Sequence, residues 1–244
     1  MKLTILGNNG PYPGPGGACS GYLLEEGETR VLIDCGSGVL ANLQKVTAIN
    51  KISAVVLTHL HNDHMSDMLV LKYAVEVGKS RGLSFGALDV WAPPEPLQMF
   101  NFLKSGSAFN VNPITPDIKL TKGELEITFA KMSHSVLCYG VSCTSGNRKF
   151  VFSGDTSWDD ELEGFFRGSD VLMLDAGLLE RDRTETAPHM TAAECGIMAA
   201  RINTGKLLLT HLWPGYDVCE VEAEAAEHYA DAKAVKILQQ ISIK

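Results

Sequence analysis

The most constraining feature of this chain is the run Thr-His-Leu-His-Asn-Asp-His at positions 58–64, which directly follows a short apolar segment. His59 and His61 are two residues apart, so in an extended segment their imidazoles project to the same side. Asp63 and His64 come after the chain turns, and they therefore face a different direction. Four metal-type ligands within six positions predict half of a two-metal centre at the end of a strand. Scattered structural histidines would not account for this density.

Three further ligand-type residues stand later in the chain, each at or near the end of an apolar, strand-like run. They are His134, Asp155 and His211. Taken singly, such residues are more typical of turns or of packed histidines. Their positions at strand ends, together with the first motif, predict that they join the same centre.

Alternating apolar patterns predict a mixed α/β chain in which strands and helices follow one another. We expect strands at residues 2–6, 21–25, 30–34, 54–57, 89–91, 125–130, 138–144, 149–152, 171–174, 207–209 and 236–241. We expect helices at residues 38–45, 66–77, 97–104, 159–167, 191–203 and 218–230. Thr191 and Glu194 form a capping box for the fifth helix, and Asp67 is expected to cap or begin the second. The expected product is two sheets with helices on both outer faces, in a single domain over residues 1–244.

Composition limits the location and the partners of the chain. Hydrophobic residues make up 45% of it, which is enough for a sizeable core, and the net charge of −8 provides no basic field for long polyanions. The six cysteines contain no C-x-x-C pair, which argues against a thiolate zinc site or a disulfide framework. No secretory signal and no membrane-spanning run is visible. We therefore expect a cytoplasmic protein without a membrane partner.

The H-x-H-x-D-H pattern after a strand, followed in order by the three later ligands, resembles the metallo-β-lactamase superfamily. The resemblance covers nearly all of the chain and implies a four-layer αββα sandwich. It implies two divalent metal ions per chain, zinc in the first place and manganese or iron as alternatives. The first ion would be held by His59, His61 and His134, the second by Asp63, His64 and His211, and both by a bridging Asp155. A water between the ions would lose its proton near neutral pH and act as the nucleophile, with Asp63 counted among the catalytic residues.

Residues 188–194, Pro-His-Met-Thr-Ala-Ala-Glu, are similar to the H-S-T motif that opens a helix in the ribonuclease Z branch of this superfamily. The resemblance implies that His189 lies near the scissile phosphate, where it bonds a nonbridging oxygen or protonates the leaving alkoxide. The alternative is a surface histidine just before a helix cap. Asp34, at a strand end, is expected either to fix the tautomer of a ligand imidazole or only to form a turn.

Two departures separate this chain from the tRNA-processing enzymes of that branch. Residues 13–18 lack the lysine and arginine of the branch's substrate loop, and only a short helix and strand lie between Asp155 and His189, where those enzymes insert a long arm. The resemblance therefore implies a phosphodiesterase acting on an RNA end or on a small or cyclic nucleotide, and a homodimer. The alternatives are a thioesterase or lactonase on the same centre, and a catalytically silent ligand-binding module. Trp213 and Tyr216 either line the substrate mouth or pack against the domain.

Overall fold

Alternation of side chains along the strands decides how this chain is layered. In β2 (Gly21–Glu26), Tyr22 and Leu24 face one apolar cluster, while Leu23 between them faces another. β3 (Thr29–Ile33) repeats this pattern with every second residue. Because both faces of these strands are apolar, the sheet must be covered on both sides.

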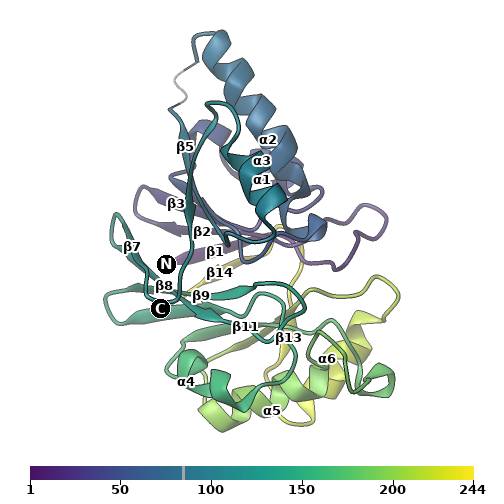
Figure 1. Cartoon of the computed structure of the whole chain (residues 1–244). Coiled ribbons are helices and arrows are strands. Elements are labelled where there is room, and N and C mark those ends of the chain that lie inside the picture. The colour runs from purple at the N-terminus through teal and green to yellow at the C-terminus, as the bar shows by residue number, and fades with distance from the viewer. Residues whose placement is uncertain (84–85) are drawn as a thin grey trace.

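The computed structural model describes residues 1–83 and 86–244, which form two mixed sheets packed face to face between layers of helices (Figure 1). The first sheet has the order β14-β1-β2-β3-β4-β5-β6 and contains, besides β2 and β3, β1 (Lys2–Gly7), β4 (Ala54–Val56), β5 (Leu88–Ala92), β6 (Phe109–Pro113) and β14 (Gln240–Ser242). The second has the order β13-β12-β11-β10-β9-β8-β7 and contains β7 (Lys119–Lys122), β8 (Leu125–Lys131), β9 (Tyr139–Ser145), β10 (Arg148–Phe152), β11 (Val171–Asp175), β12 (Leu207–Thr210) and β13 (Lys233–Ala234). In each sheet, antiparallel pairs give way to parallel ones, at β3–β4 and at β10–β11.

Helices cover the outer face of each sheet, as Figure 1 shows. On the first sheet lie α1 (Val39–Val46), α2 (Asn62–Ser80) and α3 (Leu97–Lys104). On the second lie α4 (Glu163–Phe166), α5 (Ala192–Ile202) and α6 (Val218–Ala226). Short 3-10 helices lie at Ile49–Lys51, Asp160–Leu162 and Glu180–Asp182. Among the described residues, no helix combines the length and the hydropathy needed to cross a bilayer.

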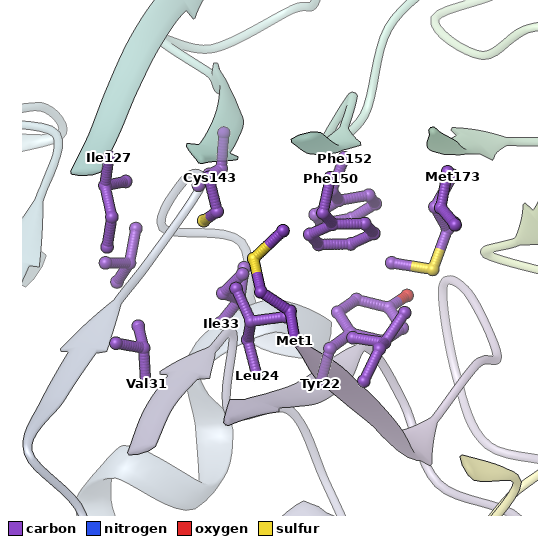
Figure 2. Packing of buried hydrophobic residues seen from close by; sticks show 14 of the residues in the cluster. Met1, Tyr22, Leu24, Val31, Ile33, Ile127, Cys143, Phe150, Phe152 and Met173 are labelled. Carbon is purple, nitrogen blue, oxygen red and sulfur yellow. The ribbon is translucent and has the colours of Figure 1, made fainter. Parts of the chain in front are cut away.

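The core between the two sheets is built from aromatic and aliphatic side chains that meet across the gap (Figure 2). Tyr22 of the first sheet packs edge-on against Phe152 of the second, with 4.8 Å between ring centroids. The Tyr22 hydroxyl lies 2.6 Å from the hydroxyl of Thr210, so its polar end is hydrogen-bonded inside the core. Phe150 is fully buried in the same layer. The four-layer αββα sandwich expected from the sequence is confirmed.

The structure corrects several expected boundaries. Only the end of the strand expected at residues 236–241 is a strand, β14. The short β13 precedes the expected range and was not predicted, and between the two strands Leu238 has a left-handed backbone (φ 64°). The expected helix at residues 159–167 is a 3-10 turn followed by the single-turn α4. The strands β6 and β7, which the sequence patterns did not predict, are partly exposed and polar, so they lack an apolar alternation.

The sequence also predicted how two helices begin. The structure corrects the prediction for α2 and confirms the one for α5. α2 begins at Asn62, four residues before its expected start, and Asp67 therefore lies within it. The Asp67 carboxylate accepts a hydrogen bond from the Leu40 amide, so it caps α1 and not its own helix. The capping box of Thr191 and Glu194 at the start of α5 is confirmed.

Candidate metal centre

The ends of strands from both sheets meet at one edge of the sandwich and bring the predicted ligands together. His59 and His61 follow β4, and Asp63 and His64 lie in the first turn of α2. Asp155 follows β10, and His211 follows β12. Because β10, β11 and β12 run parallel, their carboxyl ends lie at the same edge. The loop between β8 and β9 adds the seventh predicted ligand, His134.

The first cluster contains His59, His61, His134 and Asp155, whose donor atoms all lie within 4.8 Å of one another. His61 Nδ1 is 3.0 Å from His59 Nε2 and 3.3 Å from His134 Nε2. His59 Nε2 is 3.6 Å from Asp155 Oδ2. A tetrahedral ion with bonds of about 2.0 Å separates its ligand atoms by roughly 3.3 Å, so these donors are spaced as metal ligands are.

The second cluster contains Asp63, His64, Asp155 and His211, again within 4.8 Å. His211 Nε2 lies 3.1 Å from Asp63 Oδ2 and 3.3 Å from Asp155 Oδ2. His64 Nε2 and Asp155 Oδ1 are 3.2 Å apart and buried, and neither has a hydrogen-bond partner among the described residues. Unpaired buried polar atoms are costly unless something else binds them. The pair therefore fits a cation.

In two of these imidazoles, Nδ1 lies within hydrogen-bond distance of a protein oxygen. This contact fixes the direction in which Nε2 points. Nδ1 of His64 lies 2.8 Å from Asp34 Oδ2, and Nδ1 of His134 lies 3.1 Å from the Pro188 carbonyl. Asp34 also accepts hydrogen bonds from the amide and hydroxyl of Thr58. This arrangement is typical of metal-binding histidines, because an outer acceptor sets the tautomer.

Asp34 and His211 share an unusual backbone conformation. Both have φ of 57°, in the left-handed region that favours glycine. At Asp34 this conformation directly follows β3, and the carboxylate lies between Thr58 and His64. Its carboxylate contacts the imidazole of His64 in the second cluster, in line with the expectation that it fixes a tautomer. Such strained residues are often found at functional sites.

Charge within the clusters is balanced between imidazoles and carboxylates. Burial opposes a charged Asp155, but the imidazoles of His211 and His64 hold the pKa of Asp155 well below its ordinary value. Burial also opposes a charged His64, yet the carboxylates of Asp155 and Asp34 raise the pKa of His64 to about 10. A proton on His64 therefore compensates the buried carboxylates, and a divalent cation would replace that proton on binding.

His189 lies beside the clusters and is held by a residue that sequence reasoning missed, Asp175. His189 Nδ1 is 2.8 Å from Asp175 Oδ2, and the His189 ring stacks on that of His211 with 4.8 Å between centroids. Asp175 is fully buried, accepts hydrogen bonds from the amides of Thr156 and Gly177, and reaches within 3.5 Å of His211 Nδ1. The available signal was an aspartate directly after the apolar run of β11, the same pattern that placed Asp34 after β3.

Two glycines allow the loops to approach the clusters closely. A Cβ at Gly10 would lie 2.0 Å from His211 Nε2, and a Cβ at Gly36 would lie 1.9 Å from the Asp63 carbonyl oxygen. Real Cβ atoms do not come so close, so these positions require glycine. The loops after β1 and β3 are therefore shaped to cover the ligands.

A beta-lactamase superfamily domain matches residues 29–212. The chain is 34% identical, over 212 residues, to the probable metallo-hydrolase YhfI of Bacillus subtilis (strain 168), with 87% of each chain covered. It is 25% identical to ribonuclease Z of Bradyrhizobium sp. (strain ORS 278), with 100% of each chain covered. One of these relatives is named a probable metallo-hydrolase and the other a ribonuclease Z, in line with the resemblance seen in the sequence.

Several solved structures share this fold. The crystal structure of the metallo-beta-lactamase fold protein YhfI from Bacillus subtilis aligns with a TM-score of 0.95 at 31% identity, covering 98% of each chain. Human tRNase Z, short form, aligns with a TM-score of 0.79 at 19% identity, covering 100% of each chain. A diphosphatase from the PhnP family aligns with a TM-score of 0.76 at 17% identity, covering 100% of this chain and 98% of the diphosphatase. The last two similarities concern the fold alone. The chain therefore belongs to the metallo-β-lactamase superfamily of metal-dependent hydrolases, with ribonuclease Z-like relatives.

Proposed function

We propose that this protein is a metal-dependent phosphodiesterase that acts on a small or cyclic nucleotide or on an RNA end. Two divalent ions, most simply zinc, would occupy the two clusters, with Asp155 shared between them. The residues of the first ion would be His59, His61 and His134, and those of the second Asp63, His64 and His211. Bound there, the ions would supply the positive charge that activates water and polarises the phosphate.

The observation that carries this proposal is the placement of His189. Its Nδ1 is bound by Asp175, so its Nε2 remains for a substrate, beside the second cluster. Burial opposes a charged His189, but the Asp175 carboxylate raises the pKa of His189 and favours the imidazolium. An imidazolium can donate a proton to a leaving alkoxide or a hydrogen bond to a phosphate oxygen. A leaving thiolate would need this proton much less.

The name of one relative agrees with a phosphodiester substrate, and the charge of the chain favours a small one. Ribonuclease Z, the name of one relative, is that of an enzyme that cleaves phosphodiester bonds of RNA. The net charge of −8 disfavours long nucleic acids, whose backbones bind basic surfaces. The homodimer and the cytoplasmic location expected from the sequence stay proposals. Light scattering of the purified protein would test the first of them.

The test compares three bond types on one preparation reconstituted with zinc or manganese. We expect bis(p-nitrophenyl) phosphate to be hydrolysed faster than a thioester or a lactone. His61→Ala should abolish this activity, because it removes a central donor of the first cluster. His228→Ala is the matched control, since His228 is exposed and lies outside both clusters. Faster thioester or lactone turnover, or an inert and fully metallated protein, would overturn the proposal.

A further inference from the structure

Two cavities of different chemistry adjoin the centre, and both are lined by His189. The first, of about 390 Å³, has a largely apolar wall formed by Pro11, Leu178, Trp213 and Tyr216. The second, of about 360 Å³, is lined by hydroxyls and charged groups, among them Ser133, Ser157 and Arg183. A substrate bound at His189 could therefore extend an apolar group into the first cavity and a polar group into the second.

The wall of the first cavity is held in place before any ligand binds. Trp213 and Tyr216 contact each other edge to face, with 4.8 Å between ring centroids. Trp213 Nε1 donates a hydrogen bond to the Tyr12 hydroxyl at 3.1 Å. A Cβ at Gly215 would lie 2.6 Å from the indole ring, so the absence of a side chain there lets the ring lie against the backbone. Trp213 is still 39% exposed, which leaves an aromatic surface for a ligand.

The first cavity also contains a hydrogen-bond acceptor beside its aromatic wall. Asp182 lines it and accepts a hydrogen bond from the Tyr216 hydroxyl at 2.7 Å. Among the described residues that line this cavity, the basic ones are His189 and His211, which lie at the donor clusters. A flat, neutral group with N–H donors would suit both the Asp182 carboxylate and the rings.

We propose that this aromatic cavity, between Trp213 and His189, binds the nucleobase of a nucleotide whose phosphate lies at the donor clusters. The inference rests on the proposed phosphodiesterase function and narrows its substrate to a nucleoside-bearing phosphate. The distinguishing chemistry is stacking of a base on an aromatic face, which tolerates different bases because each has a π-face. A sugar phosphate or an alkyl diester would leave the cavity unfilled and bind more weakly.

The experiment measures binding and not turnover, by calorimetry on the metal-reconstituted protein. Adenosine 5′-monophosphate and ribose 5-phosphate carry the same phosphate and differ by the base. We expect the nucleotide to bind at least about tenfold more tightly than the sugar phosphate. Trp213→Ala should remove most of this advantage without changing the affinity for ribose 5-phosphate, and Trp213→Phe should keep most of it.

A second aromatic residue provides the matched control. Trp158 lines the polar cavity, and the Arg201 guanidinium lies 4.9 Å from the centre of its ring. Trp158→Ala should therefore leave the ratio of the two affinities unchanged. Melting temperatures of all variants check that each is folded.

Equal affinities for the two ligands, or an advantage that survives Trp213→Ala in a folded protein, would overturn the base site. The outcomes also separate this inference from the proposed function. Hydrolysis of phosphodiesters without a base-dependent affinity would overturn only the cavity assignment. A base-dependent affinity that Trp213→Ala removes, in a protein that cleaves no phosphodiester, would support the cavity and overturn the reaction.

Discussion

Two buried carboxylates, those of Asp34 and Asp175, orient the imidazoles of His64 and His189, for which we propose different roles. Asp34 lies 2.8 Å from His64 Nδ1, and the other nitrogen of that ring points at Asp155 inside the second cluster. Asp175 lies 2.8 Å from His189 Nδ1, and the other nitrogen of that ring has no hydrogen-bond partner among the described residues. A buried carboxylate at Nδ1 can therefore orient one histidine to bind a cation and another to transfer a proton.

Replacing His189 tests its role in proton transfer. We expect His189→Gln to lower kcat about 100-fold for a diester with an alkoxide leaving group, because glutamine can donate a hydrogen bond but cannot release a proton. The loss should be much smaller for bis(p-nitrophenyl) phosphate, since nitrophenolate leaves without protonation. Kinetics on both substrates, with metal content measured by mass spectrometry, check this expectation. Equal losses on the two substrates would contradict it.

Replacing Gly10 tests the close approach of the first loop to His211. The added Cβ of Gly10→Ala would lie 2.0 Å from His211 Nε2, so either the loop or the imidazole must move. We expect weaker metal binding and at least tenfold lower activity. Gly164→Ala is the control, because nothing lies within 4 Å of its added Cβ. Unchanged metal affinity in Gly10→Ala would show that the loop yields without disturbing the ligand.

At the scale of elements, apolar alternation was sufficient to predict the buried strands and was insufficient at the edges. β2 and β3 alternate because both of their faces are covered, whereas the polar edge strand β6 owes its existence to pairing with β5. The start of α2 was placed too late, because its first turn is occupied by Asp63 and its neighbours, which interact with the clusters and follow no apolar period.

The residues of the candidate centre were predictable because they lie at or near the ends of apolar strands. Metal-type ligands at strand ends can be recognised without knowing their partners, and all seven predicted ones lie in the two clusters. Asp175 could not be singled out in the same way, because its role depends on His189, fourteen residues later, reaching it in the folded chain. Which cavity is apolar likewise depends on loops that are distant in sequence, such as those of Pro11 and Tyr216.

Glu26 at the end of β2 joins the two sheets and is expected to make stability depend on pH. It accepts hydrogen bonds from Arg148 of β10 and lies 3.0 Å from the amino terminus. Hydrogen bonds from Arg148 and from the amino terminus hold the pKa of Glu26 below its ordinary value of 4.5. A carboxyl whose pKa is lowered on folding stabilises the protein above its unfolded pKa, and this contribution is lost as the pH falls through its folded pKa.

Glu26→Gln should therefore lower the free energy of unfolding by roughly 1–2 kcal/mol at pH 7. The difference from the wild type should shrink toward pH 3, where Glu26 is becoming protonated in both states. Urea titrations at the two pH values measure it. Glu28→Gln is the matched control, because the Glu28 side chain is 99% exposed. A loss of equal size at both pH values would contradict the expectation.

At the scale of the whole molecule, the candidate centre lies across the junction of the two sheets. The first sheet and its helix α2 supply His59, His61, Asp63 and His64, and the second sheet supplies His134, Asp155 and His211. Asp155 is the common member of both clusters, so any bound cation links it to donors of the first sheet. Metal binding should therefore stabilise the packing of one half of the sandwich on the other.

Removing the metal tests this coupling. A ligand that binds only the folded state stabilises it by about 2.7 kcal/mol when its free concentration is 100 times its Kd. We expect the melting temperature of a zinc-loaded sample to fall by several degrees after chelation and to recover when zinc is restored. Asp155→Ala lacks the shared carboxylate, so its melting temperature should respond much less to chelator. If chelation empties the wild-type protein, as verified by metal analysis, and leaves its melting temperature unchanged, the cations do not link the two sheets.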